Sequence, residues 1–263
     1  SEMCIRDRDI WMDISTINLN KETDINVFEN GQKPLKLMER IINSIYIKEN
    51  EDVIILDFFS GSATTAHAVL NVKASLNKKI KFIMVQLPEK CGEKTDAYKN
   101  GYKTICDIGE ERIKRAGEKI KQETNADIDY GFRVYKVDSS NMKDIYYAPT
   151  ELQQSQLNMF ESNIKDDRTA EDLLTQVILD LGLTLDLSIE EKKIINNNVY
   201  FVESNSLVAC FDDVIDINII DEICKSNPLK IVFKESSFKT DNDKINTFER
   251  IKKMSPETEV NII

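Results

Sequence analysis

Hydrophobic positions in the first half of the chain switch between the spacing of strands and that of helices. Continuous apolar runs at residues 52–59 and 80–87 are typical of strands buried on both faces, as in a parallel sheet. Residues 64–75 between them are predicted to be a helix, so this order predicts a βαβ unit. Similar patterns predict further helices at residues 34–45 and 104–120 and a further strand at residues 131–138.

The same alternation restarts after a polar stretch, residues 139–167, which lacks periodicity and marks a domain boundary. Helices are predicted at residues 170–182, 217–226 and 244–254, and strands at residues 198–204, 206–212, 229–236 and 259–263. This order predicts a small α/β domain in which a parallel sheet is covered by few helices, so some apolar surface stays open.

The pattern divides the chain into four segments. Residues 1–8 show no periodicity and resemble translated sequencing-adapter read-through, so we expect a non-native tail there. Residues 9–140 form the first α/β part, residues 141–167 a linker, and residues 168–263 the C-terminal α/β domain. With 263 residues, 41% of them hydrophobic, the chain is long enough to build packed cores.

Composition narrows the class of protein. No apolar run is long enough to span a membrane and no signal-peptide pattern is present, so we expect a cytoplasmic protein without a membrane partner. The five cysteines are scattered and form no C-x-x-C pair; we expect reduced, mostly buried thiols and no metal site. Of the net charge of −11, residues 166–263 carry −9 (20 acidic, 11 basic), which favours a protein partner or solubility there over a nucleic-acid groove.

One junction, ILDFFSGSATTAHAVL at residues 55–70, runs from an apolar strand through a polar turn into a helix. The N–H groups and dipole of a helix N-terminus attract a polar or anionic ligand, and Gly61 lets the backbone approach it. The turn matches neither the P-loop nor the dinucleotide fingerprint. Asp57, at the carboxyl end of the strand, would repel a pyrophosphate but suits the ammonium of an amino-acid group.

The segment DFFSGSATT, residues 57–65, resembles the S-adenosylmethionine motif D-x-F-x-G-S-G-T-T of amino-methylating DNA methyltransferases. The resemblance implies S-adenosyl-L-methionine as cofactor, bound by Asp57, Phe58, Phe59, Ser60, Gly61, Ser62, Thr64 and Thr65. Ala63 departs from the motif, where the family usually has Gly. If that position needs a positive φ or a close approach of the cofactor, Ala costs about 1 kcal/mol or more, so weakened binding is expected.

With KFIMVQLPE, GYKTICDIGEERIKRA and GFRVYKVDSSN, this motif resembles the Mod subunit of type III restriction-modification systems, a family that methylates adenine in DNA. Later segments, RTAEDLLTQVILDLGLTLD, LVACFDD and VFKESSFKTDNDKIN, resemble the Mod C-terminal domain. The likeness covers roughly residues 10–263. It implies the cofactor-binding half of a Rossmann-like S-adenosylmethionine-dependent methyltransferase, followed by a small α/β C-terminal domain.

Five more candidate site residues come from this resemblance or from the end of the second predicted strand. FENGQKPLKLMERII, residues 28–42, resembles the family motif F-x-x-x-K-P-x-x-L-[IM], which implies that Phe28, Lys33 and Pro34 help close the methionine pocket. Gln86 and Glu89 both stand where such folds place a residue near the ribose hydroxyls, and the choice between them stays open.

The catalytic tetrapeptide of this class, (D/N/S)-P-P-(Y/F), has no counterpart, since none of the five prolines lies in a Pro-Pro pair. The resemblance therefore implies a Mod fragment without the catalytic motif and target-recognition region, inactive alone. DNA would be bound through the missing region, with a homodimer and a restriction (Res) subunit as partners. The alternative is a non-catalytic assembly or dimerisation module of a restriction-modification complex.

Two groups receive a structural interpretation. His67 is the one histidine and has no evident catalytic or metal partners, so we expect a packed or hydrogen-bonded helix residue. Arg112, Lys114 and Arg115 in ERIKR are expected on a solvated helix face rather than against DNA phosphate.

Overall fold

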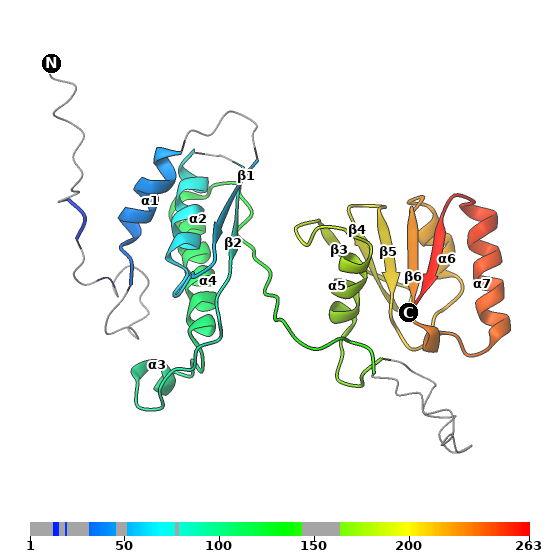
Figure 1. Cartoon of the computed structure of the whole chain (residues 1–263). Coiled ribbons are helices and arrows are strands. Elements are labelled where there is room, and N and C mark those ends of the chain that lie inside the picture. The colour runs from blue at the N-terminus through cyan, green and yellow to red at the C-terminus, as the bar shows by residue number, and fades with distance from the viewer. Residues whose placement is uncertain (1–12, 16–18, 20–31, 46–51, 77–78, 144–163) are drawn as a thin grey trace. The chain divides into compact units, whose positions relative to one another are not determined.

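A computed structural model describes residues 13–15, 19, 32–45, 52–76, 79–143 and 164–263. The chain divides into two compact units, residues 1–136 and 137–263, and each is considered by itself (Figure 1). The fold is mixed α/β, with helices and a sheet in both units.

The first unit contains the predicted βαβ arrangement. Strands β1 (Val53–Asp57) and β2 (Ile80–Met84) pair in parallel, with Val53 opposite Ile80 and Asp57 opposite Met84. Helix α2 (Thr64–Leu76) connects them, because a parallel pair needs a crossover connection (Figure 1). The junction at residues 55–70 is therefore a strand, turn and helix, as predicted.

Two helices pack around α2. Helix α1 (Leu35–Ser44) contributes Ile42 to a cluster with Val69 of α2 and Ile80 of β2. Helix α4 (Ile105–Thr124) begins at a capping box of Thr104 and Asp107 and packs its apolar stripe against α2. A short helix, α3 (Asp96–Lys99), lies between β2 and α4 in the chain. Helix α2 is consequently buried along most of its length.

The strand predicted at residues 131–138 is absent: these residues take no strand or helix conformation. Phe132 packs against the cluster of α2 and α4, whereas Val134, Tyr135 and Val137 are exposed. An apolar alternating run becomes a strand only when it pairs with a neighbouring strand, and none of the described strands pairs with these residues.

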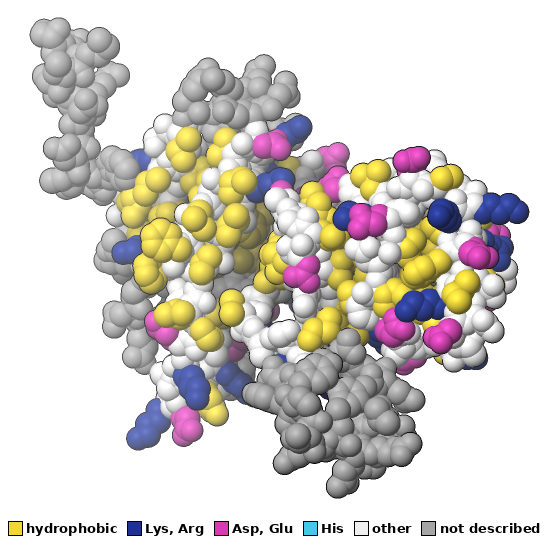
Figure 2. All heavy atoms as spheres, turned by 45° about the vertical axis from the view of Figure 1, so that its right-hand side comes forward, with side chains coloured by type: hydrophobic (Ala, Val, Ile, Leu, Met, Phe, Trp, Pro, Cys, Tyr) yellow, Lys and Arg dark blue, Asp and Glu magenta, His cyan; other side chains and the backbone are white. Residues whose placement is uncertain are grey.

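One face of the β1–β2 pair is open. Helix α2 covers the face that carries Ile55 and Phe82, while the side chains of the opposite face are exposed: Ile54, Leu56, Ile83 and Val85. Figure 2 shows hydrophobic side chains gathered on the first unit. The expectation that these strands are buried on both faces is therefore wrong, because no described element covers the face that carries these exposed apolar side chains.

The second unit is built on a five-stranded sheet in the order β3-β4-β5-β6-β7. The strands are β3 (Ile189–Ile194), β4 (Asn197–Val202), β5 (Leu207–Cys210), β6 (Lys230–Phe233) and β7 (Glu259–Ile262). β3, β4 and β5 pair antiparallel and β5, β6 and β7 parallel, so the prediction of a parallel sheet holds for half of it. Strand β3 is an edge strand that the sequence pattern does not predict. Its central Glu and Lys side chains are exposed, so it lacks the alternation of apolar and polar residues that identifies a strand.

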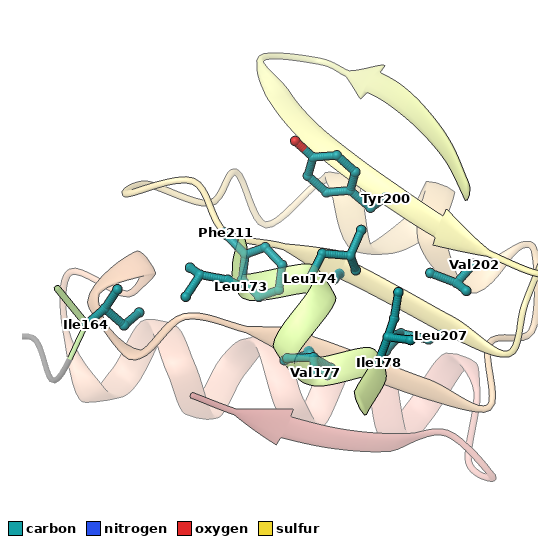
Figure 3. Close-up of a cluster of buried hydrophobic side chains, with 11 residues drawn as sticks. Ile164, Leu173, Leu174, Val177, Ile178, Tyr200, Val202, Leu207 and Phe211 are labelled. Atoms are coloured by element: carbon teal, nitrogen blue, oxygen red, sulfur yellow. The ribbon is translucent and has the colours of Figure 1, made fainter. Parts of the chain in front are cut away.

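Helices cover both faces of this sheet. On one face α5 (Ala170–Asp180) lays Leu173, Leu174, Val177 and Ile178 against the strands (Figure 3). On the other lie α6 (Ile219–Cys224) and α7 (Asp241–Met254), with a 3₁₀ turn at Glu235–Ser237 before α7. The central strands β5 and β6 are buried except for the half-buried Lys230, so the open apolar sheet expected in this domain is not found among its described residues.

No helix within the described ranges is both long and apolar enough to cross a membrane. Among the described cysteines, Cys210 and Cys224 are buried free thiols, and Cys91 and Cys106 are partly buried free thiols. Burial raises the pKa of the Cys210 thiol to about 11, which keeps it protonated and unreactive at neutral pH.

Candidate functional site

The turn between β1 and α2 takes two left-handed backbone positions, Gly61 with φ 52° and Ala63 with φ 58°. The Ala63 amide donates to the Ser60 carbonyl at 2.8 Å, and the Ala63 carbonyl accepts from the His67 amide in the first turn of α2. The chain therefore reverses sharply from the strand into the helix, and the N-terminus of α2 follows directly on the carboxyl end of β1.

Asp57 links both ends of this turn. Its carboxylate accepts a hydrogen bond from the Thr65 hydroxyl at 2.5 Å and one from the Phe59 amide at 3.3 Å. The Asp57 side chain is half-buried, so a ligand can still reach it. A local capping role and a ligand-binding role are compatible, because a carboxylate offers about four acceptor positions.

Of the two candidates beyond β2, Gln86 contacts the turn. Its Oε1 accepts from the Gly61 amide at 2.8 Å, and β2 continues toward it through the Val85 amide, which donates to the Asp57 carbonyl. The Glu89 side chain is exposed, and its backbone carbonyl accepts from the Ile105 amide. The structure thus brings Gln86, and not the side chain of Glu89, to the turn.

The other predicted site residues differ in exposure. Phe58 and Phe59 present rings that are 63% and 76% exposed, with centroids 5.2 Å apart. The hydroxyl residues Ser62, Thr64 and Thr65 are buried, and Ser60 is half-buried. The site therefore offers apolar rings on the outside and hydroxyl and amide groups within the turn.

The K-P segment lies at the start of α1. Pro34 is buried and its carbonyl accepts from the Leu37 amide, while Lys33 is exposed. Phe28 lies outside the described residues. Since α1 packs on α2, this segment belongs to a helix supported by the same helix that begins at the turn.

Ala63, the departure from the motif, has the positive φ that favours glycine. Its side chain is only 2% exposed and packs with Ala66 and Ile113 between α2 and α4. The methyl group thus points into the core rather than toward solvent, and of the two conditions named for a cost at Ala63 the positive φ is met.

Sequence reasoning missed Arg112. It was expected on a solvated face, and this is wrong: Arg112 is 1% exposed, and its Nη1 donates to Ser62 Oγ at 3.1 Å and Thr64 Oγ1 at 2.8 Å. Lys114 is exposed and Arg115 pairs with Glu111, as expected of a solvated face. A signal was available, since Arg112 lies four residues from both Ile108 and Ala116, in the apolar stripe of α4.

His67 is buried in α2, and its Nδ1 has no hydrogen-bond partner among the described residues. Burial, with smaller contributions from the positive charges of Arg112 and Lys119, lowers the pKa of His67 from 6.5 to about 3. The imidazole is therefore neutral at physiological pH and acts in packing, as expected.

This burial predicts acid sensitivity. Between pH 6.5 and about 3, His67 binds a proton in the unfolded chain but not in the folded one. The free energy of unfolding therefore decreases as the pH is lowered, and at pH 5 it has decreased by about 2 kcal/mol. NMR on the single histidine measures it: its Hε1 signal should stay at the neutral position from pH 7.5 to 5. A midpoint near pH 6.5 would contradict the assignment, and His67→Gln should remove this part of the pH dependence.

Comparisons with known proteins agree with the motifs. Residues 6–118 match the family described as DNA methylase, N6_N4_Mtase. The chain is 42% identical over 105 residues to the Mod subunit of the type III restriction-modification enzyme EcoP15I of Escherichia coli, and 38% identical over 114 residues to the StyLTI Mod subunit of Salmonella typhimurium. These matches cover 40% and 42% of this chain.

A longer match reaches the second unit. The EcoPI Mod subunit of Escherichia phage P1 is 27% identical over 188 residues, which is 71% of this chain and more than the first unit contains. The chain spans a small part of these relatives, 15% of EcoP15I Mod, 17% of StyLTI Mod and 28% of EcoPI Mod. The resemblance predicted from the motifs is therefore confirmed: residues 6–118 match the DNA methylase family, and the chain is similar to the Mod subunits of type III restriction-modification enzymes.

Proposed function

We propose that this chain is the S-adenosylmethionine-binding part and the C-terminal domain of an adenine DNA methyltransferase of the type III Mod class. The observation that carries the proposal is the turn from Asp57 to Thr65, where a half-buried carboxylate and the N-terminus of a thirteen-residue helix stand at the carboxyl end of a parallel strand. In open α/β sheets this edge is where ligands bind. We propose further that β1, α2 and β2 belong to a Rossmann-like sheet.

The residues of the turn fit the chemistry of this cofactor. Asp57 is suited to the ammonium of the methionine moiety, and the helix N-terminus to its carboxylate. The exposed rings of Phe58 and Phe59 are apolar surface against which a purine can stack, and Gln86 holds the Gly61 amide in the turn. When bound, the cofactor supplies an electrophilic methyl group on its sulfonium. The chain's own residues would bind and orient it.

Target adenine would be flipped out of the duplex and held by a tetrapeptide that this sequence does not contain, since its five prolines are all isolated. The proposal is therefore a cofactor-binding fragment that needs further polypeptide. The open apolar face of β1–β2 supports it, because parallel strands are normally covered on both faces. DNA binding, a homodimer and association with a Res subunit are proposed for the complete protein.

The test is isothermal calorimetry with S-adenosylmethionine on the chain and on Asp57→Asn. Asn keeps the shape and an acceptor for the Thr65 hydroxyl but removes the charge that would bind the ammonium. Loss of a charge-assisted hydrogen bond, about 1.5–3 kcal/mol, raises the dissociation constant by roughly 10- to 100-fold.

Asp52→Asn is the matched control, since Asp52 is an exposed carboxylate just before β1, at the opposite end of the strand. It should bind the cofactor like the parent. Equal binding by the parent and Asp57→Asn would refute the assignment of the turn.

A further inference from the structure

The first unit contains a buried cation that no motif assigns. Arg112 is the largest of the fully buried side chains in the described residues, and its Nη1 donates to hydroxyls on both sides of Ala63, at Ser62 and Thr64. These contacts join α4 to the turn across fifty positions of sequence.

Burying a guanidinium is costly unless its hydrogen-bonding groups are satisfied. The neighbouring inward-facing positions of α4 carry small or aliphatic groups, Ile108, Gly109, Ile113 and Ala116. An aliphatic residue at position 112 would pack there without that cost. The guanidinium therefore does something at the turn that packing alone does not require.

Its chemistry acts through the two hydroxyls. An arginine nitrogen only donates, so the Ser62 and Thr64 oxygens are the acceptors, and each hydroxyl proton is left for another acceptor. Both contacts come from one nitrogen, on either side of the residue with φ 58°. Arg112 thus fastens the strained position of the turn and directs donors and positive charge toward the N-terminus of α2.

We infer that Arg112 is a positioning residue of the cofactor site, holding Ser62 and Thr64 so that the N-terminus of α2 receives the carboxylate end of the ligand's amino-acid moiety. The inference rests on the proposed function. Asp57 and Arg112 then supply opposite charges for a zwitterion, the acid at the strand end and the cation beneath the helix start.

Two ligands test it by calorimetry on the full chain. S-adenosylhomocysteine carries the amino-acid moiety, and methylthioadenosine lacks it. Arg112→Met is expected to raise the dissociation constant of S-adenosylhomocysteine at least tenfold and that of methylthioadenosine less than twofold. Arg112→Lys, which keeps the charge and one donor group, should recover part of the loss. Arg115→Met, on the exposed side of the same helix, is the control and should bind both ligands like the parent.

Hydrogen exchange gives a second readout that does not depend on the ligand. In Arg112→Met the amides of Ala63 and His67 should exchange faster, while those at the end of α4 stay protected. If Arg112→Met weakened the binding of both ligands equally, its role would be purely structural and the inference would be overturned. The inference would also be overturned if the parent bound the ligands and the Arg112 variants bound them with the same affinity. A parent that binds neither ligand would overturn the proposed function together with this inference.

Discussion

In a methylation assay with tritiated S-adenosylmethionine and mixed genomic DNA, we expect the chain to incorporate no label above a control without protein. The turn at Asp57 is proposed to hold the methyl donor, but transfer also requires a group that orients the amine of a flipped adenine. In the family that this chain resembles, that group is a tetrapeptide with a Pro-Pro pair, and the sequence has none. Without it the loss of activity is complete rather than partial.

A Mod subunit that contains its tetrapeptide, assayed in parallel, shows that the DNA and cofactor are competent. Label above background with this chain would contradict the prediction, and the Asp57→Asn variant would decide its meaning. If that variant abolished the signal, a catalytic group other than the tetrapeptide would have to lie in this sequence. If the signal persisted, it would come from a contaminating enzyme.

The second large effect is expected at Gly109, where the backbone of α4 lies close to the turn. A Cβ built there would lie 3.4 Å from the Gly61 carbonyl oxygen and 3.5 Å from Ala63 Cβ. One methyl group fits at ordinary contact distance, but a leucine adds atoms that can only displace the helix or the turn. Gly109→Leu should destabilise the first unit by about 1–3 kcal/mol, as overpacking does, and should weaken cofactor binding at least tenfold.

Two variants control this prediction. Gly109→Ala should bind within twofold of the parent, because the added Cβ is tolerated and Ala favours the helix by about 1 kcal/mol. Gly117→Leu overpacks the same helix against Tyr130 instead of the turn, with a Cβ 3.4 Å from the Tyr130 carbonyl oxygen. It should lose comparable stability by circular dichroism in urea yet keep its affinity. Equal affinity losses at positions 109 and 117 would mean that stability, and not the turn, controls binding.

The βαβ unit could be predicted because its information is local. Continuous apolar strands, a helix between them and a Gly in the turn identify the junction at residues 55–70 without any long-range contact. The sequence motif also indicates that position 63 can require a positive φ, and Ala63 has this conformation in the structure. In the second unit the helices and central strands were located for the same reason, each being a short segment with its own apolar period.

What the sequence determined by itself is therefore the identity and order of most elements and the place of the turn. The tertiary structure alone decided which of them obtained partners. Residues 131–138 have a strand's pattern but no neighbouring ladder, β3 has a charged pattern but pairs with β4, and one face of β1–β2 is open. The local sequence predicts a solvated Arg112, but the packing of α4 beside the turn buries it against Ser62 and Thr64. Burial and hydrogen bonding are properties of pairs of segments, and a local pattern records only one member of each pair.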